Sequence, residues 1–168
     1  MARRGASYPY DRCVFINCPF DPTYKSLLDA LLFAIHDCGF IARIALEDVG
    51  TGQVRVDKLR ELIAKSRYSI HDLSLAENSA AKGLPRLNMA FECGLFLGAK
   101  YFGVGKHKKK DMLVLGRDQH QYKQAMSDIA GQDGAGHENE PPQLIKCVRG
   151  FLARKSGEKS IPGAAHIN

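Results

Sequence analysis

The stretch CVFINCP, residues 13–19, decides the fold. It begins with β-branched and aromatic side chains and stops at a proline, a pattern that is typical of a short buried strand. Residues 24–38 follow, with leucine and isoleucine at helical spacing, and Gly39 is a suitable residue to end a helix. The chain therefore opens with a predicted strand over 13–17 and a predicted helix over 24–38.

The same alternation continues to the end of the chain. Further strands are expected at 41–45, 68–74 and 112–116, and further helices at 54–66, 87–99 and 142–154. Weaker patterns favour a short strand at 101–104, a helix at 119–129, and loops at 75–86 and 131–136. Strands that alternate with helices form parallel sheets covered on both faces. The predicted fold class is therefore α/β, a doubly wound parallel sheet of about five strands with helices on both faces.

The length of 168 residues fits one domain. We expect this domain to span residues 12–155, between a flexible N-terminal arm (1–11) and a flexible C-terminal tail (156–168). Hydrophobic residues make up 45% of the chain and charged residues 25%, which is ordinary for a globular protein.

Composition argues against several classes of protein. The net charge of +6 permits anionic partners, but clusters of basic residues fall near the start and in a predicted turn at 106–110, so a nucleic-acid surface is not expected. The longest apolar run, residues 89–99, is too short to span a bilayer, and the first residues lack the apolar core of a signal peptide. The five cysteines form no Cys-x-x-Cys pair, which favours reduced thiols in a cytoplasmic protein and no metal site.

Glu92 is the sharpest feature of the sequence. It is the only charged residue in MAFECGLFLGA, residues 89–99. An unpaired buried carboxylate costs several kcal/mol or becomes protonated, so its presence there suggests a function. The plainer alternative is a glutamate at the edge of the helix that reaches solvent or pairs with Arg86 or Lys100.

Polar residues follow each of the first three predicted strands. Asn17, Cys18, Pro19, Phe20 and Asp21 follow the first strand, Glu47 and Asp48 follow the second, and Asp72 closes the third. Ligands of doubly wound sheets bind beyond the carboxyl ends of the strands, where the strand order reverses. We therefore expect these loops to surround one crevice, although a stiffened turn, a solvated loop and an Asx-turn are simpler interpretations. His71, which precedes Asp72, is interpreted as a core histidine.

Familiar catalytic motifs are absent. GTGQVRVDK lacks the closing residues of a Walker loop, and no Gly-x-Gly-x-x-Gly, Gly-x-Ser-x-Gly or His-Glu-x-x-His pattern occurs. Classical nucleotide triphosphatases, dehydrogenases, α/β-hydrolases and zinc peptidases are therefore disfavoured.

Three segments resemble a known group of proteins. CVFINCPFD is similar to the opening strand and loop of TIR domains, and YSIHDLS resembles their third strand. LPRLNMAFECGLFLGAKYFG resembles the Arg-x-Asn-Val-x-Phe-Glu-x-Gly stretch of bacterial TIR-like proteins that cleave NAD. The same stretch also resembles nucleoside 2-deoxyribosyltransferases, and the likeness covers about residues 13–116.

The resemblance implies a flavodoxin-like sheet and cleavage of an N-glycosidic bond. It makes Glu92 the catalytic carboxylate, matches Arg86 and Asn88 to the residues before it, and places the loop at 17–21 along a nucleotide pocket. Asp72 is a candidate second carboxylate that holds the ribose or assists a water. NAD or a related nucleotide would be substrate, with no cofactor, and self-association or a separate sensor protein would complete a defence or signalling role.

The chain departs from both families. LEDVGTGQVR replaces the usual TIR loop after the second strand, and the opening Tyr-Asp-x-Asp pattern of the transferases is missing. Three hypotheses therefore stay open: an N-glycosidase, a non-catalytic TIR-like module that binds a nucleotide or a partner protein, and, from net charge alone, a nucleic-acid binder.

Overall fold

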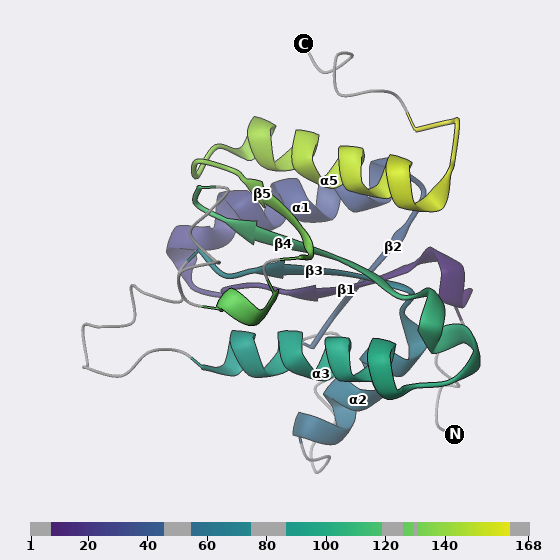
Figure 1. Ribbon diagram of the computed structural model, residues 1–168. Helices are drawn as coiled ribbons and strands as arrows, with labels where there is room; N and C mark the ends of the chain where they lie inside the picture. Colours follow the sequence, from purple (N-terminus) through teal and green to yellow (C-terminus); the bar gives the residue numbers. More distant parts are fainter. Residues whose placement is uncertain (1–7, 46–54, 75–86, 119–125, 130, 162–168) are drawn as a thin grey trace, which may run out of the picture.

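A computed structural model describes residues 8–45, 55–74, 87–118, 126–129 and 131–161 (Figure 1). Its centre is a five-stranded sheet in which every neighbouring pair of strands is parallel. The strands are β1 (Cys13–Asn17), β2 (Ile41–Ile44), β3 (Tyr68–Asp72), β4 (Asp111–Gly116) and β5 (Asp133–Gly136). They lie in the order β2-β1-β3-β4-β5, which is the flavodoxin-like order.

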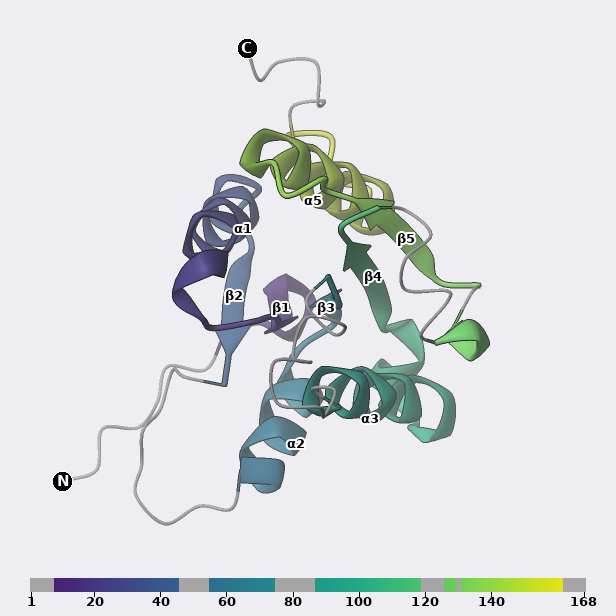
Figure 2. The ribbon, with the colours of Figure 1, turned by 90° about the vertical axis from the view of Figure 1, so that its left-hand side faces the viewer.

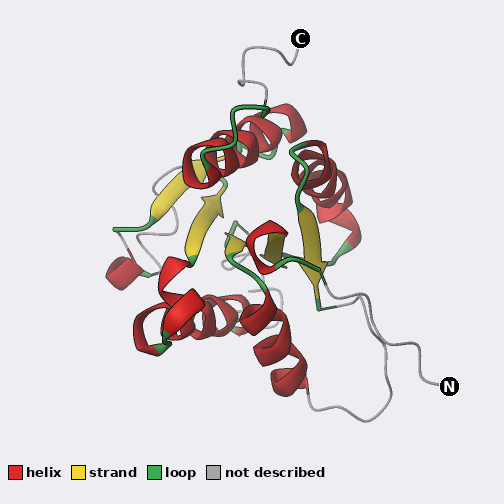
Figure 3. Ribbon diagram, turned by 90° about the vertical axis from the view of Figure 1, so that its right-hand side faces the viewer, coloured by secondary structure: helices red, strands yellow, loops and turns green. Residues whose placement is uncertain are grey.

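Helices cover both faces of the sheet. Helices α1 (Lys25–Asp37) and α5 (Pro141–Ser156) lie side by side on one face, and α2 (Arg55–Lys65) and α3 (Asn88–Phe102) lie on the other (Figures 1 and 2). The view from the opposite end shows the same three layers, coloured by secondary structure (Figure 3). The predicted α/β fold class is confirmed.

The side chains of β1 explain why its sequence is apolar without alternation. All five of its residues are buried, because the strand lies inside the sheet with a helical layer on each side. Val14 and Ile16 belong to the core beneath α1 and α5, whereas Phe15 belongs to the core beneath α2 and α3. Successive side chains of a strand thus supply opposite faces of the sheet, a rule that also governs the site described below.

Two predictions of secondary structure are wrong. Residues 101–104 do not form a strand, because α3 continues to Phe102 and Gly103 closes it with an N–H···O bond to the carbonyl of Ala99. Residues 133–136, expected within a loop, form the edge strand β5 and pair with β4 from Leu113↔Asp133 to Gly116↔Gly136. The residues of this segment have low strand propensity, so the sequence did not predict a strand. Pairing with β4 stabilises the extended backbone in place of that propensity.

Other predicted segments agree with the structure only in part or lie outside the described residues. Of the helix expected at 119–129, only its last residues are described, and Ser127–Ile129 form a 3-10 turn, while the loop at 75–86 lies outside the described residues. Residues 8–11 of the expected arm contact the domain, since the Tyr10 hydroxyl donates to the carbonyl of Lys106. The tail also packs at its start, where Ile161 is buried in the core beneath α1 and α5. Within the described ranges, no helix is long and apolar enough to cross a membrane.

Candidate active site

A cavity of about 280 Å³ opens at the carboxyl end of β1, next to the point where the strand order reverses. Nine residues line it: Asn17, Cys18, Pro19, Phe20, Asp21, Arg55, Asn88, Met89 and Glu92. They come from the loop after β1, the start of α2 and the first turns of α3. The cavity therefore lies where ligands bind in doubly wound sheets.

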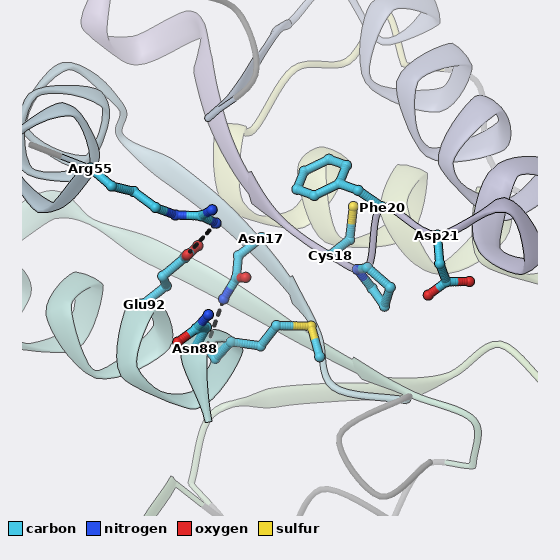
Figure 4. Close-up of a pocket in the computed structure, with 9 residues that line it drawn as sticks. Asn17, Cys18, Phe20, Asp21, Arg55, Asn88 and Glu92 are labelled. Carbon is cyan, nitrogen blue, oxygen red and sulfur yellow. Dashed lines mark hydrogen bonds and ion pairs between the residues drawn. The ribbon is translucent and has the colours of Figure 1, made fainter. Parts of the chain in front are cut away.

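The lining has a polar side and, across the cavity, a mixed side where Phe20 lies on the same side as the Asp21 carboxylate (Figure 4). Glu92, Arg55, Asn17 and Asn88 gather on one side, and Phe20 lies across the cavity from them. Such a division suits a ligand with a sugar at one end and a flat base at the other.

Glu92 lies on the inner face of α3. The buried residues Met89, Glu92, Cys93 and Phe96 follow the helical spacing that faces the sheet, so the helix turns the carboxylate inward. Its side chain is only 7% exposed, and one carboxylate oxygen lies 3.5 Å from Nη2 of Arg55. Burial raises the pKa of the Glu92 carboxyl, and the charge of Arg55 opposes the rise without cancelling it.

Asn17 ties β1 to the start of α3. Its Nδ2 donates to the backbone oxygen of Met89 at 2.7 Å and lies 3.0 Å from Nδ1 of His71. A carbonyl oxygen only accepts hydrogen bonds, so this contact fixes the orientation of the amide. Both amide hydrogens are then committed, which leaves Oδ1 as the Asn17 atom that can accept a hydrogen bond from a ligand.

His71 is a core residue, as interpreted from the sequence. It is fully buried between Phe15 and Phe96, with Nδ1 toward Asn17 and Nε2 3.0 Å from the hydroxyl of Ser69. Burial lowers its pKa to about 3, so the ring is neutral at physiological pH. Its part in the site is to hold the amide of Asn17.

Asp72 does not line the cavity, in contrast to the expectation that it shares the crevice with Glu92. Next to each other on β3, His71 faces α3 and Asp72 faces α1 and α5, because neighbouring side chains of a strand point to opposite faces. The Asp72 carboxylate accepts from the hydroxyl of Tyr24 and from the backbone N–H of Ser74, and it lies 3.1 Å from Nε2 of His137.

These partners keep Asp72 ionised although it is fully buried. Burial by itself would raise the pKa of Asp72, but the close contact with His137 and the hydrogen bonds from Tyr24 and Ser74 outweigh it and lower the pKa below its ordinary value. The geometry gives Asp72 a supporting position that joins the ends of β3 and β5 to the start of α1.

The remaining residues expected at the site divide into two groups. Cys18, Pro19, Phe20, Asp21 and Asn88 line the cavity. Glu47 and Arg86 lie outside the described residues. The side chain of Asp21 also accepts a hydrogen bond from the backbone N–H of Thr23. Burial raises the pKa of the Cys18 thiol, which keeps this thiol protonated.

Two lining residues were not expected from the sequence, Met89 and Arg55, and Arg55 is the one that carries a charge. It is the first residue of α2, and its side chain is 68% exposed at the mouth of the cavity. A signal was present, because the sequence predicts a loop at the crevice after the second strand, and Arg55 lies shortly after that predicted loop.

The described residues contain no group of three His, Cys, Asp or Glu side chains that could hold a metal ion. Neither the protein-family models nor the curated proteins compared with this chain include a match. The site offers one nearly buried carboxylate, one cation, two amides and an aromatic wall.

Proposed function

We propose that the protein is an N-glycosidase that cleaves the bond between base and ribose in NAD or a related nucleotide. The observation that carries the proposal is the Glu92 carboxylate, nearly buried at the polar side of a cavity beside the reversal of strand order. The resemblance of residues 84–103 to NAD-cleaving TIR-like proteins points to the same residue. A role as a defence or signalling effector belongs to this proposal.

The placement of the carboxylate supports the following reaction. As the C1′–N bond breaks, its electron pair leaves with nicotinamide and neutralises the pyridinium nitrogen, while positive charge develops on the ribose. Glu92, beneath C1′, stabilises this oxocarbenium ion or bonds to it. Water then forms the new C1′–O bond and loses a proton, so that the products are ADP-ribose, nicotinamide and H⁺.

The other lining residues bind and orient the substrate. Asn17, Asn88 and Phe20 line the cavity with Glu92, so Oδ1 of Asn17 and the amide of Asn88 would hydrogen-bond ribose hydroxyls, and Phe20 would offer a face for the base. The low exposure of Glu92 keeps bulk water from screening its charge, which strengthens its interaction with a cationic transition state.

A chromatographic screen tests the proposal. The purified protein is incubated with NAD, NADP and a panel of nucleotides, and released bases are separated and quantified. We expect nicotinamide release from NAD or base release from one of its relatives. An intact panel after prolonged incubation at high protein concentration would contradict catalysis.

A second candidate is a non-catalytic TIR-like module that binds a nucleotide signal or a partner protein. Two observations favour it: Glu92 is paired with Arg55, and Asp72, the expected second carboxylate, faces the other side of the sheet. Calorimetry with the same nucleotides separates the candidates, because binding without product supports the module. The family resemblance also suggests self-association and a separate sensor protein, and light scattering over a range of concentrations tests the former.

A further inference from the structure

Arg55 occupies a position from which it can contact both Glu92 and a ligand. Its Nη2 lies 3.5 Å from Oε1 of Glu92, longer than the roughly 2.7–2.9 Å of a strong charge-assisted hydrogen bond. The Arg55 side chain is 68% exposed whereas that of Glu92 is 7% exposed, so the arginine is the partner that can move. An ion pair with one solvated member is weak, and a better anion can displace it.

The charges around the cavity show which kind of anion is suited to do so. Among the described residues that line the cavity, Arg55 is the one cation, and Glu92 and Asp21 are the acids. Asp21 lies toward the far side and accepts hydrogen bonds from Thr23. A guanidinium has five donors in a planar fork that matches two oxygens of a phosphate.

We propose that Arg55 selects substrates that carry a phosphate next to the reacting ribose, by exchanging its contact with Glu92 for a bidentate contact with that phosphate. The inference rests on the proposed glycosidase function and specifies its substrate class. Nucleotides would be accepted, and the corresponding nucleosides would be poor substrates. The exchange also releases Glu92 from its ion pair when the sugar arrives, so that the carboxylate is free to face C1′.

Nicotinamide mononucleotide and nicotinamide riboside form a matched pair of probes. They share the bond to be broken and differ only in the 5′-phosphate. For the wild-type protein we expect kcat/KM for the mononucleotide to exceed that for the riboside by about 10- to 100-fold, the range expected for loss of a charged hydrogen-bonded contact. Arg55→Gln should reduce this ratio to about threefold or less. Arg55→Lys keeps the charge but not the planar fork of donors, so its ratio should lie between those of the wild-type protein and Arg55→Gln.

Arg60→Gln is the matched control. Arg60 lies on the same helix, is exposed and pairs with Asp57, and it does not line the cavity. This variant should keep the wild-type ratio. Two results would overturn phosphate selection by Arg55: an equal loss of kcat/KM for both substrates in Arg55→Gln, or equal cleavage of both substrates by the wild-type protein. The glycosidase function would stand in either case.

Binding to the Glu92→Gln variant separates failure of this inference from failure of the proposed function. Calorimetry should show the mononucleotide binding at least tenfold more tightly than the riboside, and adding Arg55→Gln should remove the difference. If the wild-type protein cleaves neither substrate but this pattern holds, phosphate selection stands and the glycosidase function falls. Equal binding of the two probes, or no binding of either, overturns phosphate selection.

Discussion

At the scale of single residues, Glu92 weakens the fold that contains it. Burial raises the pKa of its carboxyl, and Arg55 opposes this only in part. A carboxyl whose pKa is higher in the folded than in the unfolded state destabilises the fold at pH values above both, and this effect fades as the pH falls through the folded pKa toward the ordinary value of 4.5. The cost is therefore present at pH 7.

Glu92→Gln should for this reason resist urea better than the wild-type protein at pH 7. The difference in the free energy of unfolding should shrink as the pH approaches 4.5. Urea titrations followed by circular dichroism at several pH values measure both effects. A variant that is less stable at pH 7 would make Glu92 a structural anchor.

Asn17 has the opposite character, because it stabilises the fold that positions the site. Asn17→Ala leaves the Met89 carbonyl and Nδ1 of His71 without their buried donor, so we expect a loss of about 2–4 kcal/mol in the free energy of unfolding. Asn88 lines the same cavity but is exposed, so Asn88→Ala should change the free energy of unfolding by less than about 0.5 kcal/mol. Equal losses in the two variants would contradict the assigned role of Asn17.

Sequence patterns predicted the positions of Glu92, Asp72 and Arg55 relative to the cavity with different success. Glu92 stands out because a single charge in an apolar run has a physical cost, and the structure places it at the cavity. Asp72 was expected in the same crevice because it closes a strand, but the alternation of side chains on β3 turns it to the other face. Arg55 gave only the weaker signal of following a loop expected at the crevice, since an arginine at the start of an amphipathic helix is ordinary.

At the scale of elements, Gly98 inside α3 and Gly103, which caps its end, have opposite requirements. A Cβ at Gly98 would meet no atom within 4 Å, whereas a Cβ at Gly103 would lie 2.2 Å from the carbonyl oxygen of Ala99. Gly98→Ala should therefore stabilise the protein by about 0.5–1 kcal/mol through helix propensity.

Gly103→Ala should instead destabilise the protein by at least about 1 kcal/mol, because the backbone at the end of α3 has to shift. Thermal unfolding of the two variants gives the sign of each change. If both variants shift the thermal unfolding midpoint in the same direction, the backbone geometry assigned to the C-terminal end of α3 is incorrect.

The elements also show where sequence patterns stop being informative. Strong periodicity predicts β1, α1 and α5 within two residues of their observed ends. β5 consists of Asp133, Gly134, Ala135 and Gly136, which have little strand propensity, and it exists because β4 offers an edge to pair with. Aromatic residues 101 and 102 favour a strand locally, but they extend α3 and leave Phe102 90% exposed.

At the scale of the whole molecule, a buried network joins elements that are distant in sequence. The Asp72 carboxylate at the end of β3 accepts from Tyr24 before α1 and lies beside His137 after β5. Because the pKa of Asp72 is lowered in the fold, its contribution to stability is present above its ordinary value of 3.8 and is lost as the pH falls through the folded pKa.

Tyr24→Phe removes one donor from this buried carboxylate. We expect it to cost about 1–3 kcal/mol at pH 7 and less at pH 3, measured as the free energy of unfolding in urea. Tyr101→Phe, at an exposed hydroxyl, serves as the control and should be nearly neutral. A Tyr24→Phe effect that grows in acid would contradict the assigned ionisation of Asp72.

The overall arrangement was the most predictable feature. Alternating strands and helices predict a doubly wound parallel sheet, and the rule for such sheets predicts that the cavity lies at the reversal of strand order. The identity of the ligand is not encoded at this scale, because one fold accommodates many chemistries. It depends on the few side chains around Glu92.

The proposed function depends most on the carboxylate of Glu92, and one comparison tests it directly. Nicotinamide release from NAD is measured for the wild-type protein, for Glu92→Gln, and for Glu61→Gln, an exposed glutamate on α2 outside the cavity. We predict that Glu92→Gln lowers the rate at least about 100-fold while its circular dichroism spectrum is unchanged, and that Glu61→Gln keeps the wild-type rate. Release by Glu92→Gln at the wild-type rate would contradict the account.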